Sequence, residues 1–199
     1  MKKYPALFVA GTTLFLLSAC GGSKSEEKEE AKSTFGALKE FADKAEEMSQ
    51  KQPVEPVNFQ ELKALLPENL AGVARTEVGG ESTDGMGFKM SVAKAEYREE
   101  DKTLNVDIMD LGGVAGFGIA GLAAWTLANV ERETSTGYER TIKLDGHKGF
   151  EKYDNELKDG ELKVFINDRY LVSIEGNNVP MESIKSAFRQ LDISKLPKE

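Results

Sequence analysis

Apolar and polar positions divide the chain into four stretches. Two lysines precede residues 6–17, which are all apolar, glycine or threonine, and this order predicts a secretory signal over residues 1–19. Residues 20–33 contain almost nothing to bury, which predicts a disordered tether. Residues 34–52 carry apolar side chains at helical spacing, and residues 57–199 hold further helix and strand patterns that predict a single domain.

Residues 34–52 are predicted to form a short amphipathic helix. Its apolar stripe recurs every three or four residues and consists of Phe35, Leu38, Phe41, Ala42, Ala45 and Met48. Three alternatives stay open for what the stripe packs against: its own domain, a second copy of the chain, or a partner helix. We take Phe35, Leu38, Phe41 and Met48 as the candidate partner contacts.

Two helices are expected inside the domain. The first runs from Phe59 to about Leu66, because Asn58 is a good N-cap and Glu61 is placed to reach back to it. The second follows Pro180, with Ile184, Phe188 and Leu191 on one face.

Alternating apolar and polar residues predict the strands. Val73–Val78 reads as a strand ended by two glycines, and residues 138–174 read as a four-strand antiparallel meander with a hairpin at Asp145-Gly146. Between them the alternation changes phase at Val92 and Ala93, which predicts a bulge or two short strands. The fold class expected is therefore α+β: an antiparallel sheet of about six or seven strands with helices packed against it.

Residues 111–130 contain no charged side chain and five glycines. Their length would allow a membrane-spanning helix, but half of the run is glycine or alanine, so its summed hydrophobicity is marginal. We favour a loop followed by a tightly packed helix from about Gly116 to Asn129. Membrane insertion or membrane-surface contact is the alternative.

Charge and cysteine content narrow the range of functions. Removal of residues 1–19 takes away two lysines and no acid, so the net charge falls from −8 to −10. Such a charge argues against nucleic acid as a partner. Cys20 is the only cysteine, so the domain has no intramolecular disulfide.

No set of residues in the sequence makes a convincing catalytic or metal site. His147 is the only histidine and is expected at an exposed strand start. Asp107 and Asp110 are three residues apart, which places them on opposite faces of a strand. The acidic stretch 154–160 does not have the spacing of a calcium loop and is read as a hairpin turn. We expect no enzyme activity, no cofactor and no metal.

The tetrad Leu17-Ser18-Ala19-Cys20, set between the apolar run and the polar tether, resembles the lipobox of bacterial lipoproteins. The resemblance implies cleavage between Ala19 and Cys20 and lipidation of Cys20, which would tether the protein to a membrane. In that family an aspartate after the cysteine favours the inner membrane. Here the position is Gly21, so the periplasmic face of the outer membrane is expected where the organism has one.

Further segments are similar to those of uncharacterised bacterial envelope lipoproteins: Leu65–Gly72, Asp110–Gly113, Gly137–Glu139 and Lys148–Tyr153. This similarity implies no particular activity. The order of elements also resembles PsbP/Mog1-type domains, which implies an accessory or binding module.

Together these features predict a lipid-anchored lipoprotein of the cell envelope that acts as a non-catalytic binding or scaffold module. Its expected partners are the membrane, through the lipid on Cys20, and an envelope protein. A carrier of a small apolar ligand or lipid is one alternative, and an enzyme of unknown type is another.

Overall fold

The computed structural model divides the chain into two units, Met1–Ala37 and Leu38–Glu199. It describes residues 39, 42, 43, 46, 54–85, 88–113 and 128–197, all in the second unit. Lys39, Ala42, Asp43 and Glu46 are helical and exposed. Ala19, Cys20 and the candidate contacts Phe35, Leu38, Phe41 and Met48 lie outside the described residues, so those predictions stay predictions.

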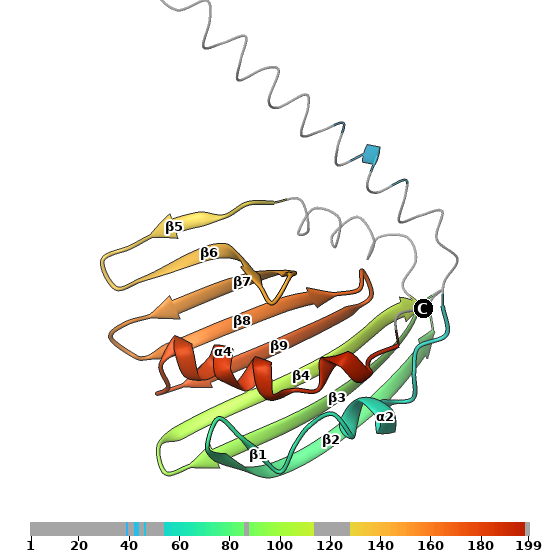
Figure 1. The fold of residues 1–199 in the computed structure, drawn as a ribbon, viewed down its shortest axis with the longest axis horizontal. Coiled ribbons are helices and arrows are strands. Elements are labelled where there is room, and N and C mark those ends of the chain that lie inside the picture. Colours follow the sequence, from blue (N-terminus) through green and yellow to red (C-terminus); the bar gives the residue numbers. More distant parts are fainter. Residues whose placement is uncertain are drawn as a thin grey trace, which may run out of the picture. The chain divides into compact units, whose positions relative to one another are not determined.

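The second unit contains one nine-stranded antiparallel sheet (Figure 1). The strands follow the order β1-β2-β3-β4-β9-β8-β7-β6-β5 across the sheet, so the first and second halves of the domain meet where β4 pairs with β9. Their bounds are β1 Asn69–Leu70, β2 Val73–Gly85, β3 Phe88–Glu99, β4 Lys102–Gly113, β5 Glu131–Glu133, β6 Gly137–Leu144, β7 His147–Asp154, β8 Asp159–Ile166 and β9 Tyr170–Asn177.

The α+β prediction is wrong, because the fold is mostly β. Over residues 54–197, as far as they are described, the helices are α2, Phe59–Lys63, α4, Met181–Gln190, and the short 3-10 helix η1, Ile193–Lys195. Only α4 exceeds five residues, whereas three strands have twelve or more. The sheet also has more strands than the six or seven expected.

Two features account for the extra strand content. Strand β2 does not end at the glycines but continues to Gly85, since β3 pairs with it along nearly its whole length. A side chain at position 80 would lie 2.7 Å from the ring of Phe59, so the glycine there lets α2 approach the strand. The second feature is the pair of short edge strands, β1 and β5, which are too brief to give a periodic signal.

The predicted bulge at Val92 and Ala93 is also wrong. Strand β3 runs through both residues, which pair in unbroken register with Met109 and Ile108. Val92 is 3% and Ala93 0% exposed although they point to opposite faces. The change of phase in the apolar pattern therefore reflects burial of both faces of the sheet at this level. The register shifts lie elsewhere, between Arg75 and Glu77 and between Lys89 and Ser91.

The meander of β6, β7, β8 and β9 confirms the strand prediction for this half of the chain. The Asp145-Gly146 turn has positive φ angles of 49° and 90°, as two-residue hairpin turns require. A similar pair at Asn167 and Asp168 joins β8 to β9.

Both helices lie on the same face of the sheet, the helix-covered face (Figure 1). Strands β8, β9 and β4 turn fully buried side chains such as Leu162, Ile174 and Val106 toward it. Helix α4 packs there through Ile184 and Phe188, confirming the predicted apolar face of that helix. We call the other side of the sheet the opposite face.

Residues 114–127, the greater part of the uncharged run, lie outside the described residues. Among the helices that are described, none has the length and hydrophobicity needed to span a bilayer.

Candidate functional site

One row of polar side chains crosses the opposite face at a single level of the sheet. Each member is the register partner of the next, so the row takes one residue from each of eight strands. Neighbouring strands are about 4.8 Å apart, and the row therefore extends over roughly 34 Å. From β2 to β5 this cross-strand row consists of Glu77, Glu96, Asn105, Glu175, Glu161, Lys152, Glu139 and Arg132.

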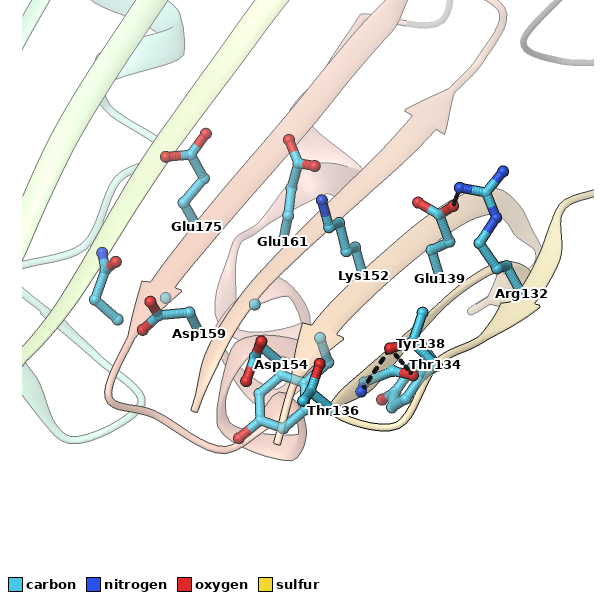
Figure 2. A pocket seen from close by; sticks show the side chains of 15 residues that line it. Arg132, Thr134, Thr136, Tyr138, Glu139, Lys152, Asp154, Asp159, Glu161 and Glu175 are labelled. Carbon is cyan, nitrogen blue, oxygen red and sulfur yellow. Dashed lines mark hydrogen bonds and ion pairs between the residues drawn. The ribbon is translucent and has the colours of Figure 1, made fainter. Parts of the chain in front are cut away.

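A groove of about 530 Å³ lies over one half of the row, between β9 and β5. Figure 2 shows side by side the members of the row that line this groove: Glu175, Glu161, Lys152, Glu139 and Arg132. The lining carries more acids than bases, so the groove has a net negative charge: the acids are Glu139, Asp154, Asp159, Glu161 and Glu175, and the bases are Arg132 and Lys152.

Some of these charges are already paired within the protein. Arg132 lies 2.8 Å from Glu139, and Glu161 pairs with Lys163 from the next level of its own strand. Among the described residues, Glu175 and Lys152 are exposed and have no ion-pair partner. The groove therefore presents a free carboxylate on β9 and a free ammonium group on β7, two strands away or about 10 Å.

The character of the opposite face changes from one end of the strands to the other. The level beside the cross-strand row, toward the end of β4, carries both charged and neutral polar side chains in register: Lys94, Asp107, Ser173 and Lys163. The level after that is largely apolar in its centre, with Val92, Met109, Leu171 and Phe165.

The groove and the incoming chain lie at opposite ends of the sheet. The apolar level is nearer to the end of β4, where the backbone N–H of Val54 donates to the carbonyl of Gly112 at 2.9 Å. The groove is lined near the start of β4, by Gly176 and Asn177, which pair with Leu104 and Thr103. The chain thus enters the domain at the end away from the groove.

Asp107 and Asp110 point to opposite faces, as their spacing predicted. Asp107 is partly buried on the opposite face, and burial raises the pKa of its carboxyl group while the charge of Lys94 lowers it. Asp110 is fully buried and pairs with Arg169, whose Nε and Nη2 atoms lie 2.8 and 2.7 Å from the two carboxylate oxygens of Asp110. The hydrogen bond to Asp110 raises the pKa of Arg169.

The acidic stretch 154–160 forms a hairpin turn, as predicted. One oxygen of Asp154 accepts hydrogen bonds from the backbone N–H groups of Glu156 and Leu157, both at 2.9 Å. Asp159 accepts from the N–H of Asn178 at 3.2 Å. Within the described residues, no three acidic, histidine or cysteine side chains are grouped in a way that would hold a metal ion.

His147 begins β7, as expected for a residue after the Asp145-Gly146 turn, but it is half-buried and not fully exposed. It does not line the groove.

A second buried carboxylate ties α4 to the sheet. Glu151 on β7 is 0% exposed and lies 2.6 Å from the Nη2 atom of Arg140 and 2.8 Å from Nζ of Lys185. Burial lowers the pKa of Lys185, but the hydrogen bond that Lys185 donates to Glu151 and the negative charge of that carboxylate outweigh this effect, so the pKa of Lys185 is raised overall. The arrangement joins β6, β7 and α4 and leaves Glu151 closed to solvent.

Sequence reasoning missed the cross-strand row and the partners of both buried carboxylates. The polar positions of each strand were visible as alternation, but the row exists only because β4 pairs with β9. Comparisons with protein-family models, with curated protein sequences and with solved structures found no match.

Proposed function

We propose that this chain is a lipid-anchored lipoprotein of the bacterial cell envelope whose domain is a non-catalytic binding module. The groove over the cross-strand row is its binding surface. The observation that carries the proposal is the combination, in this groove, of a net negative charge with exposed, unpaired Glu175 and Lys152. Unpaired charges at the rim of a binding surface steer partners and set their orientation.

The anchoring half of the proposal rests on the sequence. Leu17–Cys20 supplies the lipobox, and residues 20–33 supply a tether on the order of 20 Å long. The proposed partner of the groove is a protein of the aqueous compartment beside the membrane. Where the organism has an outer membrane, its periplasmic face is the favoured location, because in the lipoproteins that the lipobox resembles an aspartate after the cysteine favours the inner membrane and here that residue is Gly21.

The groove favours a cationic partner, because five acids face two bases there. A side chain at Gly176 would lie 2.7 Å from Ile184, so α4 and the sheet are in close contact there. This contact leaves no space for an apolar ligand between α4 and β9 at that point.

Anchoring is tested by labelling cells with a palmitate analogue. The parent chain should be labelled and sediment with membranes, and Cys20→Ser should be neither labelled nor sedimented. An unlabelled parent chain, or labelling that survives in Cys20→Ser, would contradict a lipid on this residue.

Binding is tested by cross-linking in intact cells, followed by mass spectrometry. We expect one reproducible protein neighbour whose yield falls at least fivefold in Glu175→Lys and is unchanged in Glu182→Lys, which makes the same charge change on the helix-covered face. Loss of the neighbour only when Phe41 and Met48 are made polar would move the binding surface to residues 34–52. A neighbour whose yield is affected neither by Glu175→Lys nor by the changes at Phe41 and Met48 would contradict the proposal that the groove is the binding surface.

A further inference from the structure

Residues 54–57, which we call the strap, enter the domain across the ends of β4 and β9. Among the described residues, three hydrogen bonds to the backbone of the strap hold it against the sheet. The N–H of Val54 donates to the carbonyl of Gly112 at 2.9 Å, and the N–H of Val57 donates to Oδ2 of Asp110 at 2.8 Å. The carbonyl of Glu55 accepts from Nη2 of Arg169 at 3.2 Å.

Two of these three bonds go to the buried Asp110–Arg169 pair. The side chains of the pair are 0% and 8% exposed, and the second oxygen of Asp110 also accepts from the N–H of Gly112 at 2.9 Å. The buried pair therefore holds the strap from both residues: Asp110 accepts a hydrogen bond from Val57, and Arg169 donates one to Glu55. Charged groups make stronger hydrogen bonds than neutral ones, so the two bonds to this pair are the stronger contacts of the strap.

The side chains of the strap contribute little to holding it. Val54 is 43% exposed, Glu55 is exposed and Val57 is only half-buried. Glu55 pairs with Lys89 at 3.0 Å, but both side chains are largely in solvent, where such pairs add little. Val57 packs against the edge of the hydrophobic core, so the strap buries some apolar surface but depends mainly on its polar contacts.

We propose that the strap is releasable and that the buried Asp110–Arg169 pair is the element that holds it closed. Release separates the strap from the sheet without separating β4 from β9, because those strands pair independently from Thr103 to Asp110. The effect of release on the distance between the domain and the membrane rests on the proposed lipid anchor. Four freed residues would lengthen the connection to the membrane by about 13 Å.

The test is hydrogen–deuterium exchange of the purified full chain, followed at the backbone N–H of Val54 by NMR. Val57→Pro removes the N–H that donates to Asp110 and leaves the buried pair intact, and Asp110→Asn weakens the pair itself. We expect exchange at Val54 to become at least tenfold faster in both variants. Exchange of the backbone N–H groups that join β4 to β9, from Thr103 to Asp110, serves as the internal reference and should not change.

Lys89→Ala is the matched control, because it removes exposed ion pairs with Glu55 and Asp84 and no bond to the backbone of the strap, and exchange at Val54 should stay within twofold of the parent. Unchanged exchange at Val54 in Val57→Pro would overturn the proposal. So would faster exchange at Val54 and across the β4–β9 pairing together in Asp110→Asn, since the pair would then hold the sheet and not the strap. None of these measurements depends on the lipid, so a failure here is distinct from a failure of palmitate labelling.

Discussion

Asp107 lies near the centre of the opposite face, between Lys94 on β3 and Ser173 on β9. Burial raises the pKa of its carboxyl group, and the charge of Lys94 only partly offsets this effect. The folded state therefore binds the proton more tightly than the unfolded state, and stability falls as pH rises between the two pKa values. Above that window the ionised Asp107 carries its full desolvation cost.

Asp107→Asn should accordingly raise the free energy of unfolding at pH 7 by about 0.5 kcal/mol. The gain should vanish below the ordinary aspartate pKa, where Asp107 is protonated in both states. Urea unfolding at a series of pH values measures this difference, with Glu99→Gln as a control for the change of net charge at an exposed position. A loss of stability at pH 7 would mean that the attraction of Lys94 exceeds the cost of burial.

At single positions, sequence reasoning was correct where the geometry of one strand alone determines which face a side chain occupies. Asp110 follows Asp107 by three positions along a strand, and the strand period placed the two side chains on opposite faces. The partner of Asp110 was beyond reach, because Arg169 follows it by many residues and becomes its neighbour only through the pairing of β4 with β9.

Helix α4 approaches β8 and β9 so closely that glycine is needed under it. A side chain at position 176 would lie 2.3 Å from Val179 and 2.7 Å from Ile184, whereas one at position 79 on β2 would meet nothing within 4 Å. These two strand glycines therefore form a matched pair of sites for the same substitution.

Gly176→Ala should lower the free energy of unfolding by about 1–3 kcal/mol, because the added methyl group overpacks the helix–sheet contact. Gly79→Ala should leave the free energy unchanged or raise it by up to about 1 kcal/mol, since alanine loses less backbone entropy in a strand. Thermal and urea unfolding of both variants measure the two changes in the free energy of unfolding. Equal effects at the two positions would show that α4 moves to accommodate the methyl group.

For whole elements, the sequence predicted strands and turns best where the local signal was complete. The meander and its Asp145-Gly146 turn were correct because alternation and turn residues agreed. The limits of β2 and the continuity of β3 were wrong because tertiary pairing carried one strand through glycines and buried both faces of the other. That error, with the two brief edge strands, is what turned a mostly-β domain into an expected α+β fold.

The two halves of the domain are joined by pairs far apart in the chain, such as Thr103 with Asn177. A long loop must close before β4 and β9 can form their hydrogen bonds, and folds dominated by such contacts fold slowly. Refolding of the purified chain by dilution from urea should therefore take milliseconds to seconds in a stopped-flow experiment. Relaxation within microseconds would contradict a rate set by this pairing.

For the molecule as a whole, the groove could not be predicted from the sequence. Its residues come from five strands, and their order across the sheet depends on the pairing of β4 with β9. The sequence showed only the alternating charged residues of the individual strands.

Strand β2 is also relevant to how copies of the domain behave when crowded on a surface. Over the described residues, its outer edge pairs with β1 only at Val73 and Ala74, and the remainder has no further strand beside it. Such an edge is a template for polymerisation, but this one carries Glu77, Glu81 and Asp84 beside two glycines. Two copies meeting edge to edge would oppose like charges, so the domain stays resistant to aggregation at high local concentration.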